Sequence, residues 1–355
     1  MGGCESNGSL HPHCQNPRYT LSMHAKNQEV IQSADARTVH QIAALLNKYS
    51  DEGKDISCYL EKLLQEKNLD YTDYLNLDTL LTLQKPRTGQ PDEVVFIIYH
   101  QVVELFFSLM IWELKQLTSP SQIPIDPLTF SEKIDRLNRY VQILIASFQV
   151  ILDGLDKEQF QKFRVTLFPA SGFQSCQYRL IEFYITDLKN LVAVRSRGEV
   201  LPDADLRFLY DRLYWKIGMT NPRKGDKSPT LTDFEDRYDG ILFTHAAAHK
   251  SRNLWQVFKH QLAGDPTAPE IVNGLRQLDE SMNVRWQSLH YKVAMKYLTT
   301  DENTQIQSTG GSHWRKYLHP HFQKIIFFPA LWTESEMADW GAQEYWKTQQ
   351  DYTAG

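Results

Sequence analysis

The longest strongly apolar stretch of the chain runs from residue 92 to residue 117. A helix of this composition is apolar on almost every side, and such helices are buried on most sides. Its middle nevertheless carries His100, Gln101 and Glu104. A buried ionisable side chain costs free energy unless it is paired or used. Two interpretations of His100 follow: a core histidine satisfied by Glu104 one helical turn away, or a pocket histidine that hydrogen-bonds a ligand.

Apolar residues recur with helical spacing over most of the remaining chain, and sustained alternation typical of strands is absent from the sequence. Residues 325–328, Ile-Ile-Phe-Phe, are the one short run that could form a strand. We therefore predict an all-α fold. The expected helices beyond residues 92–117 cover residues 131–152, 158–168, 174–192, 206–215, 234–262, 270–298 and 334–350.

The polar segments define the expected domain organisation. Residues 1–33 are rich in Gly, Ser, Asn, Pro and His, which is typical of a disordered tail. Residues 34–355 are expected to form a single all-α domain. Within it, residues 194–232 carry Arg, Asp, Gly and Pro throughout and are expected to form a polar insertion with a short helix.

Composition narrows the class of protein. The net charge is −5 with 23% charged residues, which excludes a general nucleic-acid binder. The apolar stretch is interrupted by polar residues, so we interpret it as a core helix and expect no membrane partner. The N-terminus lacks the apolar core of a signal peptide. The cysteines show no metal or redox spacing, so a cytoplasmic protein is expected; they are Cys4, Cys14, Cys58 and Cys176.

Three further side-chain groups could carry chemistry. His245 and His249 have the spacing at which two helical imidazoles bind one metal, but no third ligand is evident nearby, so a polar helix face is the simpler interpretation. Arg164 precedes a Pro-Ala-Ser-Gly turn and offers a planar fork for a carboxylate, although most such arginines lie at the surface. His290 lies among apolar residues, as a structural histidine or an axial haem ligand would.

Several segments occur in an order that resembles one known family. The most specific are the helix around His100 and the Ser171–Ser175 segment, and the likeness spans about Leu69 to Leu318. The segments that carry it are Tyr71–Leu75, Leu80–Gln84, Phe96–Leu105, Phe163–Arg164, Ser171–Glu182, Trp286–His290 and Thr309–Ser312. Together they resemble the tryptophan 2,3-dioxygenase family of haem enzymes.

The resemblance implies a helical bundle that encloses a b-type haem. It also implies an enzyme of tryptophan catabolism in the kynurenine pathway, which cleaves the indole C2–C3 bond of L-tryptophan or a close derivative with O₂ to give N-formylkynurenine. On the haem side, His290 would be the axial ligand of the iron. Ser171 and Gly172 would lie against the haem, and Tyr178 and Arg179 would lie near its propionates.

On the substrate side, the resemblance implies that His100 is the catalytic histidine and hydrogen-bonds the indole N–H. Phe96 would pack against the indole, Arg164 would pair with the substrate carboxylate, and Thr309 would hold the amino-acid head group. The family forms homo-oligomers, dimers or tetramers, and a homotetramer is expected. Two tyrosines of a neighbouring subunit, Tyr71 and Tyr74, would complete the wall of the substrate pocket.

The sequence departs from the family pattern near the substrate head group. Phe160 stands where a tyrosine that reaches the carboxylate is often found, and Gln149 replaces a frequent tryptophan. The residues after His100 read Glu104-Leu-Phe-Phe-Ser108, and the glycine-rich loop continues as Ser308-Thr-Gly-Gly-Ser-His-Trp314. These departures leave two alternatives open. One is a haem-dependent monooxygenase of the same scaffold that acts on a modified tryptophan or another aromatic amino acid in secondary metabolism; the other is a non-catalytic haem or ligand-binding protein.

Overall fold

The computed structural model describes residues 35–51, 60–61, 70–119, 124–221, 224–299 and 318–344. The expected tail over residues 1–33 lies outside these residues. The chain divides into two compact units, Met1–Thr82 and Leu83–Gly355. The first unit contains three described helices, α2 (Ala36–Asp51), α4 (Tyr71–Leu75) and α5 (Leu77–Leu80). The boundary predicted at residue 34 for the main domain stays a prediction.

The central helix of the second unit is α6 (Asp92–Thr118), which matches the predicted range to within one residue. Its first turn is anchored by the buried carboxylate of Glu93, which accepts hydrogen bonds from the backbone N–H groups of Arg87 and Thr88, both at 2.7 Å. These bonds keep the pKa of Glu93 low against the opposing effect of burial. The anchor therefore fixes where α6 begins and how the preceding loop lies.

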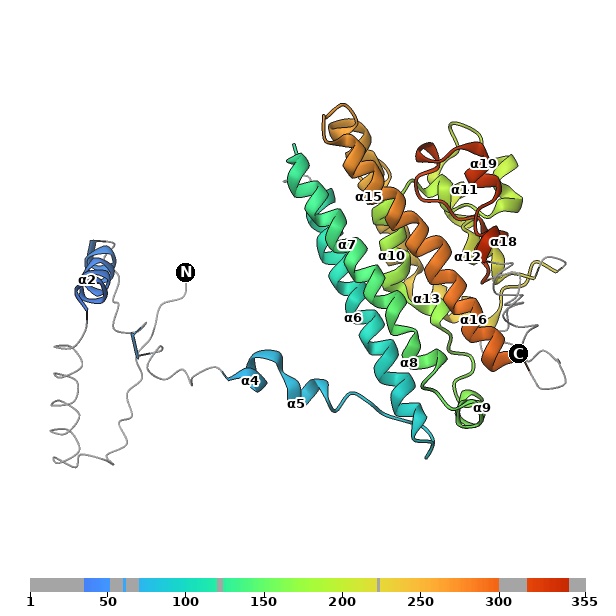
Figure 1. The fold of residues 1–355 in the computed structure, drawn as a ribbon, viewed down its shortest axis with the longest axis horizontal. Coiled ribbons are helices and arrows are strands. Elements are labelled where there is room, and N and C mark those ends of the chain that lie inside the picture. The colour runs from blue at the N-terminus through green and yellow to red at the C-terminus, as the bar shows by residue number, and fades with distance from the viewer. Residues whose placement is uncertain are drawn as a thin grey trace. The chain divides into compact units, whose positions relative to one another are not determined.

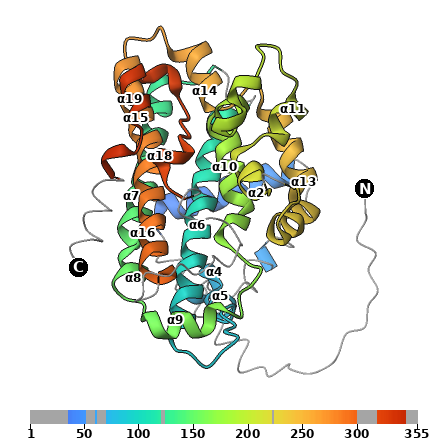
Figure 2. The same cartoon turned by 90° about the vertical axis from the view of Figure 1, so that its right-hand side faces the viewer.

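Long helices run beside α6 in this unit and cover one of its faces (Figures 1 and 2). α6 packs on α7 (Pro127–Ser147) and α10 (Cys176–Ile185), and α7 packs on α15 (Ala268–Glu280). α15 continues through the π-helical turn η6 (Ser281–Trp286) into α16 (Gln287–Leu298). The other described elements are α8 (Gln149–Leu152), α9 (Lys157–Arg164), η2 (Gly172–Gln174), η3 (Leu188–Leu191), η4 (Val194–Glu199), α11 (Leu206–Asp211), α12 (Tyr214–Gly218), α13 (Pro229–His249), α14 (Leu254–Val257), η5 (Phe258–Leu262), α18 (Pro320–Gln323), η7 (Pro329–Leu331) and α19 (Glu334–Ala338).

The all-α prediction is confirmed: in the described ranges the only β-type pairing consists of two isolated bridges. α6 is long and apolar enough to cross a membrane by length and composition, a test that the core helix of a soluble protein also passes. Here its buried Glu113 forms ion pairs with Lys133 at 2.7 Å and Arg136 at 3.1 Å on α7. The fully buried Met110 and Leu114 pack into the core, whereas Ile98, Leu105 and Trp112 are 44%, 54% and 65% exposed. The expectation that α6 is buried on most sides is therefore wrong, because only one face of the helix is covered.

The short strand considered for residues 325–328 does not form. The segment is buried, and its amide groups point at a carboxylate instead of at a neighbouring strand. The N–H groups of Phe327 and Phe328 donate to Asp279 at 2.9 and 3.0 Å, and Trp332 Nε1 donates to the same carboxylate at 3.0 Å. Asp279 closes α15, so these bonds fasten the C-terminal segment to the helix that leads to His290.

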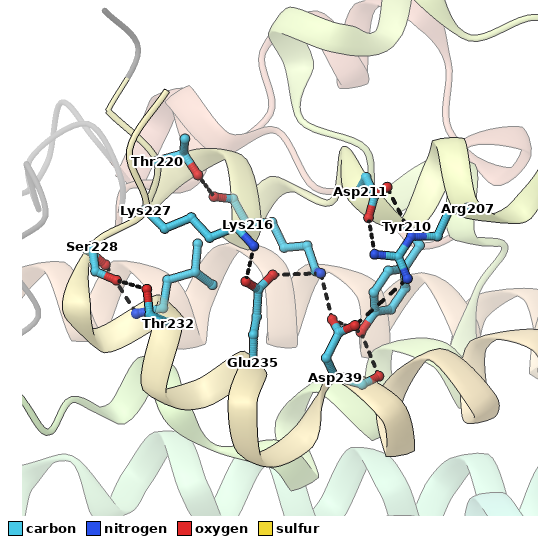
Figure 3. Close-up of polar contacts among 11 residues, drawn as sticks. Arg207, Tyr210, Asp211, Lys216, Thr220, Lys227, Ser228, Thr232, Glu235 and Asp239 are labelled. Carbon is cyan, nitrogen blue, oxygen red and sulfur yellow. Dashed lines mark hydrogen bonds and ion pairs between the residues drawn. The ribbon is translucent and has the colours of Figure 1, made fainter. Parts of the chain in front are cut away.

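The segment predicted to be a polar insertion contributes to the core. Tyr210 and Trp215 are fully buried. Between them and α13 lies the buried Lys216, whose Nζ is 2.7 Å from both Glu235 Oε1 and Asp239 Oδ1 (Figure 3). A buried ammonium flanked by two carboxylates is compensated within the protein. The charged residues of this segment thus stabilise its packing on α13.

Candidate active site

The first half of α6 presents Phe96 and His100 one turn apart on the same face. Their rings lie 4.1 Å apart between centroids. His100 Nδ1 is 2.7 Å from the backbone carbonyl of Phe96, so this nitrogen carries the proton and donates. Desolvation lowers the pKa of His100, which is therefore neutral at pH 7. Its Nε2 is left as a hydrogen-bond acceptor.

The expected carboxylate partner of His100 is engaged elsewhere. Glu104 accepts a hydrogen bond from Gln177 Nε2 at 2.8 Å, and its backbone carbonyl accepts from the same amide at 2.9 Å. The hydrogen bond of His100 goes to its own helix backbone instead. The interpretation of His100 as a core histidine satisfied by Glu104 is therefore not the arrangement observed.

His290 lies on α16 immediately after the π-helical turn η6, a helix distortion that is common at functional sites. Its Nδ1 is 3.1 Å from the carbonyl of Trp286, so Nδ1 again donates to the helix backbone and Nε2 keeps its lone pair. Desolvation lowers the pKa of His290 to about 4. The result is a neutral imidazole with a free ligating nitrogen, oriented by a backbone carbonyl as in many metal-bound histidines.

Aromatic rings connect the two histidines. The ring of Phe148 lies 4.8 Å from that of His290 and 6.1 Å from that of Tyr99, which in turn lies 5.4 Å from His100. Each histidine retains some accessible surface although desolvation lowers the pKa of both. The structure therefore brings the two imidazoles to one aromatic cluster, in which the rings of Tyr99 and Phe148 join them.

Phe148 was not among the residues singled out from the sequence. It belongs to the apolar side of a predicted helix, and nothing in the local pattern separates it from other core residues. Its position between Tyr99 and His290 arises from the packing of α6, α7 and η6. The ring of Trp286 lies 4.7 Å from both His290 and Phe148. Trp286 begins one of the segments that resemble the family, but the resemblance gave it no role.

Arg164 lies at the end of α9 and is buried, and desolvation lowers its pKa. The preceding residue, Phe163, contacts the ring of Phe96 at 5.5 Å, which places this end of α9 beside the first half of α6. Phe160, one turn earlier, lies 6.0 Å from Phe96 and 5.3 Å from Phe163. An aromatic ring without a hydroxyl therefore occupies the position where the family often has tyrosine.

The starts of α6 and α9 are tied to each other. The carboxylate of Asp92 accepts a hydrogen bond from the N–H of Asp156 at 2.7 Å, and the Gln159 side-chain carbonyl accepts from the N–H of Asp92 at 3.1 Å. Asp156 also caps α9 through the N–H of Gln159. Each helix thus supplies a cap to the other, which fixes Arg164 relative to His100.

The Ser171–Ser175 segment forms a short 3₁₀ turn, η2, with a capping box between Ser171 and Gln174. The Gln174 side chain also donates to the carbonyl of Thr230 on α13 at 3.2 Å. Gly172 is exposed, and a Cβ atom at this position would meet no heavy atom within 4 Å. This part of the turn therefore has open space beside it, and its contact with a haem stays a prediction.

Tyr178 and Arg179, which follow on α10, are buried. The Tyr178 hydroxyl accepts a hydrogen bond from Gln287 Nε2 at 2.9 Å, so this tyrosine contacts the helix that carries His290. Arg179 donates to Glu182 Oε2 at 3.2 Å and to Tyr214 Oη at 2.7 Å. These contacts of Arg179 stabilise α10 against α12, and its role at a haem propionate stays a prediction.

The remaining predicted site residues lie in the first unit or outside the described residues. Tyr71 and Tyr74 lie on α4 of the first unit and are 73% and 72% exposed. Thr309 and the rest of the glycine-rich loop lie outside the described residues. Their roles stay predictions.

The donor set and its surroundings fit a haem. Haem iron takes an imidazole as axial ligand, and His290 offers an oriented neutral Nε2 in an apolar setting. A non-haem metal at His245 and His249 has less support, because the described residues contain no group of three or more metal-ligating side chains. Lys115 and Arg252 also lie beside that pair.

Comparisons with known proteins point in the same direction. Residues 58–205 match the family model described as "Tryptophan 2,3-dioxygenase". A protein of that name from Bdellovibrio bacteriovorus is 39% identical over 318 residues, covering 70% of this chain and 87% of its own. One from a Polaromonas species is 36% identical over 277 residues (75% and 87%), and one from Myxococcus xanthus is 28% identical over 282 residues (74% and 87%).

Proposed function

Because the chain belongs to the tryptophan 2,3-dioxygenase family, we propose that it is a haem-dependent dioxygenase that cleaves the indole C2–C3 bond of L-tryptophan or a close derivative with O₂, giving N-formylkynurenine. One observation carries the proposal. Two neutral histidines, His100 and His290, each donate Nδ1–H to their own helix backbone and leave Nε2 as an acceptor, and the rings of Tyr99 and Phe148 join them.

In this proposal His290 ligates the iron through Nε2. When bound, the haem supplies the chemistry that activates O₂ for insertion of both oxygen atoms across C2–C3. Ser171 and Gly172 lie against one haem face, where the open space beside Gly172 supports the assignment. Tyr178 holds α16 through Gln287, and Arg179 is assigned to the propionate side on the resemblance alone.

The substrate is positioned by side chains of the distal side. His100 Nε2 accepts the indole N–H, and Phe96 packs against the indole ring. Arg164 forms a bidentate ion pair with the α-carboxylate; support comes from its burial and from its place next to Phe163, whose ring contacts Phe96. His100 acts as a neutral hydrogen-bond acceptor, so its depressed pKa favours the role. Thr309 is assigned to the ammonium end of the substrate.

The remaining assignments concern the assembly and the location of the enzyme. We propose a homo-oligomer, a tetramer in the first instance, in which Tyr71 and Tyr74 of one subunit cover the pocket of another. Large exposed aromatic side chains are expected where a surface is covered in the assembled state. A cytoplasmic location is proposed from the cysteines, which show no metal or redox spacing.

One observation favours a second candidate function. Phe160 places an apolar ring beside Phe96 and Phe163, where a hydroxyl could otherwise assist in binding the carboxylate. A haem-dependent monooxygenase that acts on a modified tryptophan or another aromatic amino acid, with a head group altered or absent, would suit this environment. It would insert one oxygen atom and leave the ring closed.

The test is a turnover experiment on the purified full-length protein. The ferrous protein, prepared anaerobically, is mixed with O₂ and L-tryptophan while the absorbance of N-formylkynurenine is followed. Its appearance, with consumption of one O₂ per tryptophan, supports the dioxygenase. A product heavier by one oxygen from a tryptophan analogue supports the monooxygenase, and a haem spectrum without O₂ consumption for any indole supports the non-catalytic alternative.

A further inference from the structure

A cleft of about 330 Å³ lies between the end of α6, the end of α10 and the end of α13. Lys115, Tyr184, His245, His249 and Arg252 line it, together with small and hydroxyl-bearing residues. Lys115 is 15 residues beyond His100 on α6, which corresponds to about 22 Å along the helix axis. The cleft is therefore separate from the aromatic cluster that joins His100 and His290.

The charges around this cleft are of one sign. Lys115 and Arg252 contribute two cations, and no carboxylate is among the lining residues. Helices α6, α10 and α13 all end here, and each helix C-terminus contributes about half a negative elementary charge. Arg252 Nε donates to the carbonyl of Ala248 at 2.7 Å, so one cation already contacts the end of α13. Two full positive charges still outweigh three such partial charges by about half an elementary charge.

The two histidines present different hydrogen-bonding atoms. His249 Nδ1 lies 2.9 Å from the carbonyl of His245 and donates to it, so its Nε2 is an acceptor while the ring is neutral. His245 Nδ1 is buried without a partner. A buried lone pair costs less than a buried N–H left unsatisfied, so the proton of His245 is placed on Nε2, where it serves as a donor. Desolvation and the neighbouring cations lower the pKa of His245.

The geometry points to a binding site for a small oxyanion-bearing molecule, held by Lys115, Arg252 and the Nε2–H of His245. His249 Nε2 would accept a proton-bearing group of the same ligand, such as a hydroxyl or the P–OH of a monohydrogen phosphate. The ring of Tyr184, 4.2 Å from that of His249, forms an aromatic wall. A divalent cation is disfavoured here because both fixed charges that line the cleft are positive.

Two probes distinguish the phosphate and carboxylate forms of this chemistry: inorganic phosphate and benzoate. Each is titrated into the purified full-length protein at pH 7 and constant ionic strength, with chloride as the balancing anion, while Tm is followed by circular dichroism. A ligand that binds the folded state raises Tm, and a concentration near ten times Kd should give a rise of about 3 °C. A concentration-dependent rise in Tm with either probe supports the site. The probe that causes the rise shows whether the site takes a phosphate or a carboxylate.

The variants locate the effect. Lys115→Gln combined with Arg252→Gln should weaken binding of the effective probe at least tenfold. Lys115→Glu alone, at an exposed position, should abolish it if the double variant does not fold. Arg139→Gln, which removes an exposed charge from α7 away from the lining residues, should bind as the wild type does. Absence of a saturable shift with both probes, or equal shifts in wild type and Lys115→Glu, would overturn the proposal.

Discussion

The assignment of His100 as the acceptor for the indole N–H can be tested with one substitution and one substrate analogue. His100→Ala removes an acceptor whose Nε2 is kept free by the 2.7 Å bond between Nδ1 and the carbonyl of Phe96. A neutral hydrogen bond contributes about 0.5–1.5 kcal/mol, and an indole N–H left buried without a partner costs about 1–3 kcal/mol. The variant should therefore lose about 5-fold to 150-fold in kcat/KM for L-tryptophan.

The analogue 1-methyl-L-tryptophan separates this hydrogen bond from general packing. It has no N–H to donate, so the wild type should process it less efficiently than L-tryptophan, while His100→Ala should discriminate little between the two. The assay is steady-state kcat/KM for both substrates with both proteins. An equal loss for both substrates in His100→Ala would refute the assigned bond, because truncation would then act through packing alone.

Four further predictions follow from the same structure. His290→Ala should lose most of its bound haem, measured by the absorbance ratio of haem to protein after gel filtration, and full haem retention would contradict the axial assignment. Phe160→Tyr should lower KM for L-tryptophan several-fold by adding a hydroxyl near the carboxylate, whereas unchanged kinetics would place this ring outside the head-group site. Asp279→Asn should reduce the free energy of unfolding by about 4 kcal/mol, because an amide leaves about two of the four donors to this side chain unsatisfied. Urea denaturation measures this change, with Asp203→Asn at an exposed position as the control. A loss under 1 kcal/mol would count against the reasoning. Burial lowers the pKa of His290 from 6.5 to about 4, so as the pH falls the unfolded state is protonated at this residue before the folded state is. The haem-free protein should therefore lose stability as the pH falls from about 6.5 to 4. The variant His290→Gln should lose less stability over the same pH range.

Helix ends could be predicted from the sequence where the residues at those ends are strong start or stop signals. Pro91 with two acidic residues starts α6 and a Ser-Pro sequence follows its end, so its bounds could be predicted to within one residue. The predicted helix over residues 234–262 is instead interrupted. α13 ends at His249, and Asn253 starts a new helix by accepting the N–H of Gln256 at 3.0 Å. Asn is a preferred N-cap residue, so the sequence itself carries a signal for this break.

Other features depend on contacts between distant residues. The apolar run at residues 325–328 resembles a strand, but Asp279, almost fifty residues earlier, captures its amide groups. The pairing of Arg179 with Tyr214 likewise joins residues 35 apart. No local pattern encodes such partners, so the resemblance could suggest a propionate role for Arg179 but could not reveal the cluster that holds it.

The candidate site was predicted in its composition more than in its arrangement. His100, Phe96 and His290 were predicted from segments that resemble the family, and the structure joins the two histidines through the rings of Tyr99 and Phe148. The backbone hydrogen bonds that fix the free nitrogen of each imidazole could not be predicted, because they depend on the side-chain rotamers. The ring of Phe148 between them depends on helix packing.

The most direct test of the central proposal is the isotopic composition of the product. The ferrous protein is allowed to react with L-tryptophan under ¹⁸O₂, and the product is isolated for mass spectrometry. A dioxygenase that cleaves C2–C3 should give N-formylkynurenine containing two labelled oxygen atoms from one O₂ molecule. A ring-closed product with one labelled oxygen, or unlabelled and unchanged tryptophan, would contradict the proposed function.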